Sequence, residues 1–254
     1  MSNKSIYFLS DVHLGSRSLN NDRERELHLI TFIDSIKEHC ASLWLMGDIF
    51  DFWFEYKHAV PKGHTRLLGK LSELTDQGIE VHIFTGNHDI WMFGYLEQEC
   101  GVRIHTNITE LITLNNKTLL LGHGDGLNPK DIGFKIIRTV FHSKFAQWLF
   151  RIIHPDCGIA LARKWSSHSR KAQGGVTQYQ YSGDNHEDSV IFSNEYVTLH
   201  PEVDYVIFGH RHLPFEVILK NGATYINLGD WLTQFTYAEL TTSGELFLKK
   251  FPMA

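Results

Sequence analysis

Five short polar clusters combine residue types that bind metal ions. Each joins aspartate, histidine or asparagine, and none contains cysteine: Ser10-Asp11-Val12-His13, Gly47-Asp48-Ile49-Phe50-Asp51, Gly86-Asn87-His88-Asp89, Gly122-His123-Gly124-Asp125 and Gly209-His210-Arg211-His212. Carboxylate, imidazole and amide donors suit divalent ions such as Mn²⁺, Fe²⁺, Co²⁺ or Zn²⁺ rather than Cu(I) or an iron–sulfur cluster. The clusters therefore predict a divalent metal site.

The clusters supply too many donors for one tetrahedral ion. The candidate ligands are Asp11, His13, Asp48, Asn87, His123, His210 and His212. This set matches two ions that share a bridging carboxylate and each keep a position for water or substrate. Two ions ~3.5–4 Å apart stabilise both the attacking and the leaving oxygen in phosphoryl transfer and activate water near neutral pH. The donor set therefore predicts phosphoryl-transfer chemistry.

Each cluster alone is weak evidence. An isolated Asp-x-His or Gly-His sequence is more often a turn or a solvated pair, and Asn-His-Asp favours a loop. The order of the five clusters, each directly after an apolar run, favours a metal site. Most other histidines lack this context, among them His28, His39, His58, His64, His105, His186 and His200. His82 alternates within an apolar run, so we interpret it as a packed or edge residue.

The elements that must position these residues alternate between strands and helices. The expected strands are Ile6–Leu9, Leu43–Met46, Val81–Phe84, Thr118–Leu121, Tyr205–Phe208 and Thr224–Ile226. Helical periodicity covers 22–39 and 65–77, and 235–251 is typical of a closing hairpin. The alternation predicts an α/β fold, in which ligands bind at the carboxyl ends of strands. Glycine precedes four clusters, where it would let the backbone turn.

Composition excludes several classes of protein. The chain has 254 residues, of which 43% are hydrophobic and 21% charged, so it is not disordered. No apolar run approaches the ~20 residues of a membrane span, and the first ten residues are too short for a secretory signal. Three distant cysteines predict reduced thiols in a cytosolic protein. The net charge of −5 argues against a general nucleic-acid binder.

The segment 135–171 differs from the rest of the chain. It has eight basic residues and one acidic residue, a net charge of +7, and many large apolar residues. Positions 137, 141, 145, 148, 149 and 152 would share one helical face, with Phe141, Phe145, Trp148 and Leu149 as candidates to line a groove. Such a segment is either an amphipathic helix packed on the core or a groove and membrane-facing surface for an acylated anionic ligand. We expect a single domain over 1–254 with a helical cap at about 132–172, followed by a polar loop.

The ordered clusters resemble the calcineurin-like metallophosphoesterase family. The resemblance covers residues 10 to 212 and implies a four-layer α/β/β/α sandwich with a two-metal centre. It implies that Asp11, His13 and His212 hold one ion, that Asn87, His123 and His210 hold the other, and that Asp48 bridges them. It also implies that His88 lies beside the reacting phosphoryl group and that Asp89 orients the His88 ring.

Three stretches resemble one branch of that family, the UDP-2,3-diacylglucosamine diphosphatases: FLSDVHLG, LMGDIFDFWF and LGHGDGLNPKD. The resemblance implies hydrolysis of the pyrophosphate bond of UDP-2,3-diacylglucosamine to UMP and 2,3-diacylglucosamine 1-phosphate in lipid A biosynthesis, with Mn²⁺ as the expected metal. The implied substrate contacts are Asn87, His88, Asp131, Ser169, Arg170, Lys171 and His210. One position departs from the branch, since His88 replaces the arginine of its well-known members.

The cysteines, the net charge and the apolar, basic segment together predict a cytoplasmic protein attached peripherally to the inner face of the cytoplasmic membrane, with no nucleic acid and no obligatory protein partner. Two alternatives remain. One is a soluble phosphodiesterase or phosphatase of the same superfamily, acting on cyclic nucleotides, nucleic acid or phosphoprotein, which the apolar insertion and acidic remainder disfavour. The other is a non-enzymatic scaffold, which the complete ligand set disfavours.

Overall fold

The structure is a computed structural model that describes residues 4–16, 21–172, 180–181 and 183–252. Inside two helices, the side chains of residues 134, 163 and 165–172 also lie outside the description.

Two mixed sheets form the centre of the molecule. The first has the order β11 (Leu246–Lys250), β10 (Thr236–Leu240), β1 (Ser5–Leu9), β2 (Cys40–Leu45), β3 (Glu80–Phe84), β4 (Arg103–His105). The second has the order β5 (Thr109–Leu114), β6 (Lys117–Gly122), β7 (Tyr205–Phe208), β9 (Thr224–Leu228), β8 (Pro214–Ile218). Strands β1, β2 and β3 run parallel, as do β6, β7 and β9.

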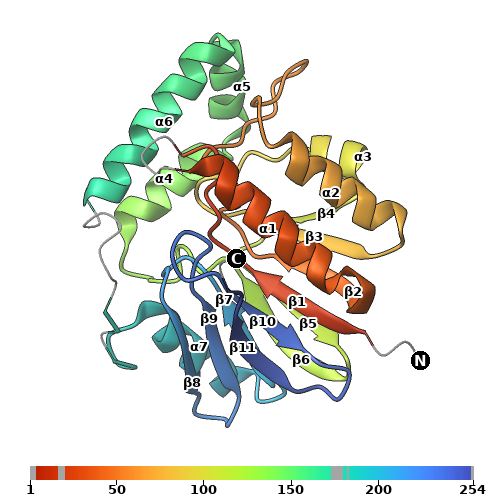
Figure 1. The fold of residues 1–254 in the computed structure, drawn as a ribbon. Coiled ribbons are helices and arrows are strands. Elements are labelled where there is room, and N and C mark those ends of the chain that lie inside the picture. The colour runs from red at the N-terminus through yellow and green to blue at the C-terminus, as the bar shows by residue number, and fades with distance from the viewer. Residues whose placement is uncertain (1–3, 17–20, 173–179, 182, 253–254) are drawn as a thin grey trace.

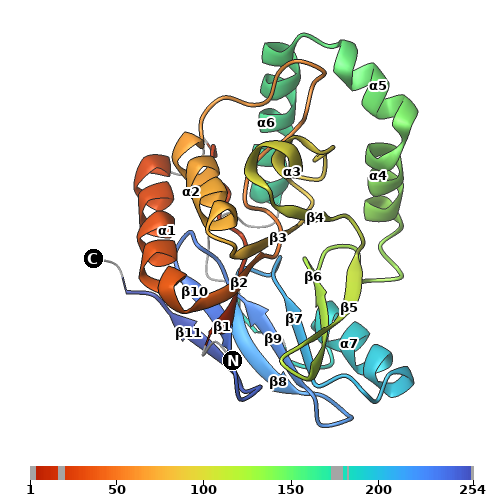
Figure 2. The same cartoon turned by 90° about the vertical axis from the view of Figure 1, so that its right-hand side faces the viewer.

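Helices cover the outer faces of the two sheets. On one side lie α1 (Asp22–Ile36), which continues into the short 3₁₀ helix η1 (Lys37–His39), α2 (Thr65–Asp76) and α3 (Tyr95–Cys100), and α7 (Asp188–Leu199) lies on the other (Figures 1 and 2). The order of layers is therefore helix, sheet, sheet, helix, which confirms the predicted α/β/β/α sandwich.

Side-chain alternation along the strands explains the layers. In β1, Tyr7 and Leu9 pack with α1 and α2, whereas Ile6 and Phe8 point between the two sheets. In β6, Leu119 and Leu121 face that same inner layer, whereas Leu120 packs with α7. Strands buried on both faces read as continuous apolar runs, which is why the six predicted strands are found within a few residues of their expected positions.

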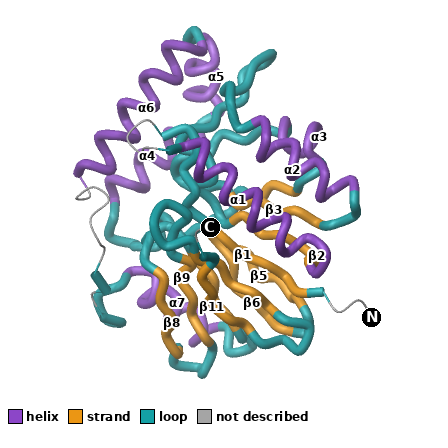
Figure 3. Tube along the Cα trace, in the orientation of Figure 1, coloured by secondary structure: helices purple, strands orange, loops and turns teal. Residues whose placement is uncertain are grey.

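Three further helices follow β6 and gather at one end of the molecule, away from the sheets (Figure 3). They are α4 (Ile132–His142), α5 (Lys144–Ile152) and α6 (Pro155–Ala172). The Ser143 side chain caps α5 by accepting from the Ala146 N–H. The single helical face predicted across this segment is therefore wrong, because the chain turns at Ser143. Within the described residues, no helix has the length and apolarity needed to cross a membrane.

Candidate metal centre and adjoining pocket

The predicted ligands lie in the loops that leave the parallel strands. Asp11 and His13 follow β1, Asp48 follows β2, and Asn87 follows β3 in the first sheet. Loops after β6 and β7 of the second sheet supply the remaining three: His123, His210 and His212. Because parallel strands end at the same edge of a sheet, these loops converge.

Backbone strain marks this edge of the molecule. Five predicted ligands adopt left-handed φ values: 57° at Asp11, 48° at His13, 53° at Asp48, 67° at His210 and 53° at His212. Non-glycine residues rarely adopt this conformation, and it concentrates at functional sites where surrounding structure enforces it. The strain therefore supports a functional role for the loops.

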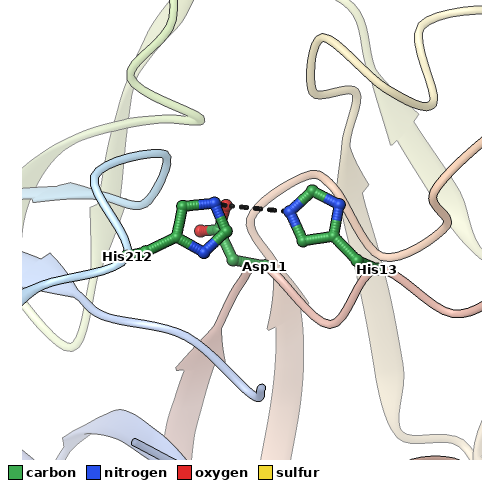
Figure 4. Close-up of side chains that lie close together, drawn as sticks. All are labelled: Asp11, His13 and His212. Carbon is green, nitrogen blue, oxygen red and sulfur yellow. Dashed lines mark ion pairs between the residues drawn. The ribbon is translucent and has the colours of Figure 1, made fainter. Parts of the chain in front are cut away.

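Asp11, His13 and His212 form the first group able to hold a metal ion (Figure 4). Asp11 Oδ1 lies 3.8 Å from His13 Nε2 and 3.5 Å from His212 Nε2. These separations exceed a hydrogen bond and suit donor atoms arranged around one cation. The second Asp11 oxygen accepts the His210 N–H at 2.9 Å, which fixes the carboxylate.

Asp48, His123 and His210 form the second group. Asp48 Oδ2 lies 3.4 Å from His123 Nε2 and also 3.7 Å from His13 Nε2 of the first group. The other Asp48 oxygen accepts the His88 N–H at 2.9 Å. One carboxylate oxygen thus faces both groups, as expected of a bridging ligand.

Several polar atoms of the predicted ligand residues are buried without a hydrogen-bond partner. They are Asp11 Oδ1, His13 Nδ1, His13 Nε2, Asn87 Oδ1 and His123 Nε2. A buried polar atom without a partner costs about 1–3 kcal/mol. Four of the five are predicted donors that would each be satisfied by a cation, so the residues present fit a pair of divalent ions.

The electrostatics of the cluster favour positive charge. Burial lowers the pKa of His13, but contacts with Asp11 and Asp51 outweigh burial and raise it to about 10. Burial likewise opposes protonation of His123, yet Asp48 and Asp11 hold the pKa of that ring well above its usual value. Carboxylates therefore dominate the local potential, as a cation site requires.

Neighbouring groups orient two of the histidine rings. His123 Nδ1 donates to the Met46 carbonyl at 2.9 Å, so Nε2 is the nitrogen turned to the second group. His212 Nδ1 lies 3.6 Å from Asp230 Oδ2, and Asp230 is itself fixed by backbone N–H groups, among them that of Thr233. Sequence reasoning missed Asp230, although it follows β9 as the predicted ligands follow their strands.

Two of the glycines that precede the clusters have a different role than predicted, whereas Gly47 has the left-handed φ of 93° that a turn requires. At Gly86, where φ is not in the left-handed region, an added Cβ would come within 2.2 Å of Asp48 Oδ1. At Gly209, it would come within 2.6 Å of Asp11 Oδ2. These two glycines leave space for ligand carboxylates, so the predicted role in turning the backbone is wrong for them.

The expected pairing of Asp89 with the His88 ring is also wrong. Asp89 is buried, and its oxygens accept backbone N–H groups of Gly86, Asp48, Ile49 and Phe50. The His88 ring instead approaches Asp51, with Nδ1 3.2 Å from the Asp51 carbonyl. Asp89 thus ties the loop after β2 to the loop after β3, and Asp51 is the neighbour that orients His88.

A pocket of about 400 Å³ adjoins the two groups. Polar residues Asp51, Asn87 and His88 line the end nearest the predicted ligands. The rest of the lining is mostly apolar: Phe52, Trp91, Val140, Phe141, Ala146, Gln147, Phe150, Leu161 and Ala162. The pocket therefore joins the candidate metal centre to helices α4, α5 and α6.

Only one of the four predicted groove residues lines this pocket. Phe141 does, whereas Phe145, Trp148 and Leu149 lie on the outer surface of α5 with 68%, 56% and 47% of their surface exposed. The turn at Ser143 separates the two sets. Sequence periodicity missed Phe150, which packs against Trp91 at 5.2 Å between ring centroids.

The remaining predicted substrate contacts lie apart from the pocket or outside the description. Asp131 is exposed just before α4 and does not line the pocket. Helix α6 includes Ser169, Arg170 and Lys171, but their side chains lie outside the described part of the chain.

Residues 4–214 match the calcineurin-like phosphoesterase family, which spans both ligand groups. The chain belongs to this family. Divalent metal binding therefore follows from the family and the donor set together.

The chain is also similar to two curated relatives and, in fold, to one solved structure. The chain is 38% identical over 245 residues to UDP-2,3-diacylglucosamine hydrolase of Porphyromonas gingivalis, covering 92% of each chain. It is 27% identical over 252 residues to UDP-2,3-diacylglucosamine hydrolase of Haemophilus influenzae, covering 97% of this chain and 99% of the relative. A hypothetical protein from Pyrococcus horikoshii shares the fold with a TM-score of 0.50 at 9% identity, covering 97% of this chain and 87% of that chain.

Proposed function

We propose that this protein hydrolyses the pyrophosphate bond of UDP-2,3-diacylglucosamine to UMP and 2,3-diacylglucosamine 1-phosphate, a step of lipid A biosynthesis. The observation that carries the proposal is the apolar pocket that opens beside Asn87 and His88, next to the two ligand groups. A diphosphate bond at the metal centre would place the acyl chains of such a substrate in this pocket. The relatives named above support the same substrate.

In this proposal Asp11, His13 and His212 hold one ion, and Asn87, His123 and His210 hold the other. Asp48 bridges the two, and Mn²⁺ is the proposed metal. When bound, the ions offset charge on the phosphoryl oxygens and lower the pKa of the attacking water. The protein positions the phosphoryl group by fixing these donors on strained loops, so little reorganisation is needed during the reaction.

His88 has a separate role at the mouth of the pocket. Its Nδ1 donates to the Asp51 carbonyl, so Nε2 is the nitrogen that we assign to the substrate. In its protonated form, Nε2 would donate to a phosphoryl oxygen or to the leaving-group oxygen. Burial lowers the pKa of the His88 ring, and the negative charge of an arriving diphosphate would oppose that shift.

The outer face of the cap helices supports peripheral attachment to the cytoplasmic face of a membrane. Large apolar side chains there are exposed: Ile132, Ile136, Phe145, Trp148, Leu149 and Ile152. Lys135, Lys144 and Arg151 belong to the same helices. Apolar and basic groups on one surface suit the interface of an anionic bilayer. We expect the wild-type protein to co-sediment with vesicles that contain anionic lipid. A Phe145→Ser, Trp148→Ser double variant that stays in the supernatant would support the assignment of this face to membrane binding.

The proposal is tested by the products. Purified protein loaded with Mn²⁺ is incubated with UDP-2,3-diacylglucosamine in ¹⁸O-labelled water, and the products are identified by mass spectrometry. We expect UMP and 2,3-diacylglucosamine 1-phosphate, with ¹⁸O in one of the two. UDP and free diacylglucosamine, or no reaction by a protein with two ions per chain, would contradict the proposal and favour another phosphoester.

A further inference from the structure

An ion pair connects helix α4 to one of the ligand loops. Arg138 Nη1 lies 2.8 Å from Asp125 Oδ2, and Asp125 stands two residues after His123. The Asp125 side chain is only 2% exposed and the Arg138 side chain 16%. Because few water molecules reach this pair, it fixes α4 more firmly than a surface ion pair would.

A second pair holds the chain where it returns from the cap helices. Arg211 stands between His210 and His212, and its Nε and Nη2 donate to the two oxygens of Glu187 at 2.8 and 2.9 Å. Glu187 is buried and directly precedes α7. Both ends of the segment that contains α4, α5 and α6 are therefore attached to loops that carry predicted ligands.

The first pair also lies close to the wall of the pocket. Val140 and Phe141, within one turn of Arg138 on α4, line that wall. The Phe141 carbonyl accepts from Trp91 Nε1 at 2.9 Å. Helix α4 is thus held at Arg138 and at Phe141, and a rotation about either contact would move the wall relative to His88.

We propose that Arg138 is a positioning residue. Through its ion pair with Asp125, Arg138 keeps the apolar pocket at a fixed position relative to the metal centre. This position makes the protein select an acylated substrate over small phosphoesters. This inference rests on the proposed function, because it names what sets the specificity of that site. Arg138 acts through α4 and does not contact the reacting atoms.

The test compares two substrates in an Arg138→Met variant loaded with Mn²⁺. For UDP-2,3-diacylglucosamine we expect kcat/KM to fall about tenfold or more, mainly through KM, because a displacement of about 1 Å is sufficient for such losses. For bis(p-nitrophenyl) phosphate, which does not fill the pocket, we expect kcat/KM within about twofold of wild type. Equal losses for both substrates, or none for the lipid, would overturn the proposal.

Two further variants separate positioning from the cost of a buried unpaired carboxylate. The double variant Arg138→Met, Asp125→Asn removes that charge. We expect it to keep the lowered kcat/KM for the lipid substrate that we expect of Arg138→Met. Arg138→Lys retains a donor for Asp125, and we expect partial recovery of the KM. If the double variant recovers wild-type selectivity, the loss in Arg138→Met is caused by the unpaired buried charge of Asp125 and not by lost positioning.

Arg103→Met, which removes an exposed pair with Glu80, is the matched control and should behave as wild type.

Hydrogen exchange gives a readout that needs no substrate. In Arg138→Met we expect faster amide exchange across α4, with exchange in α2 unchanged. If wild-type protein binds two ions and ignores the lipid substrate, the proposed function fails, and this measurement still decides whether Arg138 anchors α4. Unchanged exchange in α4 would overturn the anchoring itself.

Discussion

Asp48 is the side chain on which both candidate ion sites depend, since its Oδ2 faces His13 and His123 together. We predict that Asp48→Ala lowers the metal content from two ions per chain to fewer than one, because the repulsion between two cations is no longer offset. His212→Ala, which removes a terminal donor, should retain the ion of the other group. Elemental analysis of both variants measures this, and two ions in Asp48→Ala would remove the residue from the bridge.

Residue types and their order along the chain predicted which side chains would meet. All seven predicted ligands lie at one edge of the sheets, because position after a parallel strand determines where a side chain goes. The neighbours of these ligands could not be predicted in the same way. Asp230 and the contact between His88 and Asp51 depend on how loops from different strands pack, and no local pattern encodes that packing.

At the scale of the element, Gly86 determines whether the loop after β3 can accommodate the carboxylate of Asp48. A Cβ at Gly86 would lie 2.2 Å from Asp48 Oδ1 and 2.5 Å from the Asp48 nitrogen. We predict that Gly86→Ala loses the bridging ligand and most metal binding, measured by calorimetric titration with Mn²⁺. Gly69→Ala in α2 is the control, since nothing lies within 4 Å of that position and alanine favours a helix by ~1 kcal/mol. Wild-type affinity in Gly86→Ala would show that the loop relaxes freely.

His82 in β3 gives a prediction for stability against pH. Its ring stacks on Trp44 at 3.8 Å, and burial, followed by the nearby His105, lowers its pKa to about 4. Between pH 6.5 and 4 the unfolded chain therefore binds more protons at this position than the folded chain, so stability falls as pH falls. We predict that wild type loses up to about 3 kcal/mol of unfolding free energy from this residue between pH 7 and 4.

The measurement is urea unfolding of wild type and His82→Gln across that pH range. The variant lacks the titrating ring, so the difference between the two curves reports His82 together with its 3.0 Å contact with His105. His105 and Glu110, which face each other at 2.7 Å, are present in both proteins, as is Glu80, 3.5 Å from the His82 ring. Parallel curves would show that the ring is equally easy to protonate in both states.

Elements with a clear sequence pattern were predictable: the continuous apolar runs, the helices at 22–39 and 65–77, and the closing hairpin of β10 and β11. Strands β1, β2, β3, β6, β7 and β9 are buried on both faces, which gives them a strong signal. Strand β5 is only half-buried and β4 has three residues, so neither stands out from the surrounding chain. In the cap, periodicity alone extended one helix through Ser143, because a single capping residue outweighs a continuous apolar pattern.

At the scale of the whole molecule, the cap helices present two distinct apolar surfaces. One, including Phe141 and Phe150, lines the pocket beside His88. The other, including Phe145 and Trp148, faces outward. We assign acyl chains to the first surface and a bilayer to the second, so substitutions on the two surfaces should have separable effects.

The most direct test of this account is the ratio of kcat/KM for UDP-2,3-diacylglucosamine to that for bis(p-nitrophenyl) phosphate, measured in detergent solution without a bilayer. We predict that Phe141→Ser lowers this ratio about tenfold or more, since burial of an aromatic side chain against an acyl chain contributes roughly 1.5–3 kcal/mol. Trp148→Ser, an equally drastic change on the outer face, should leave the ratio as in wild type. An unchanged ratio in Phe141→Ser, with two ions bound and the fold intact, would contradict the assignment of the pocket to the substrate.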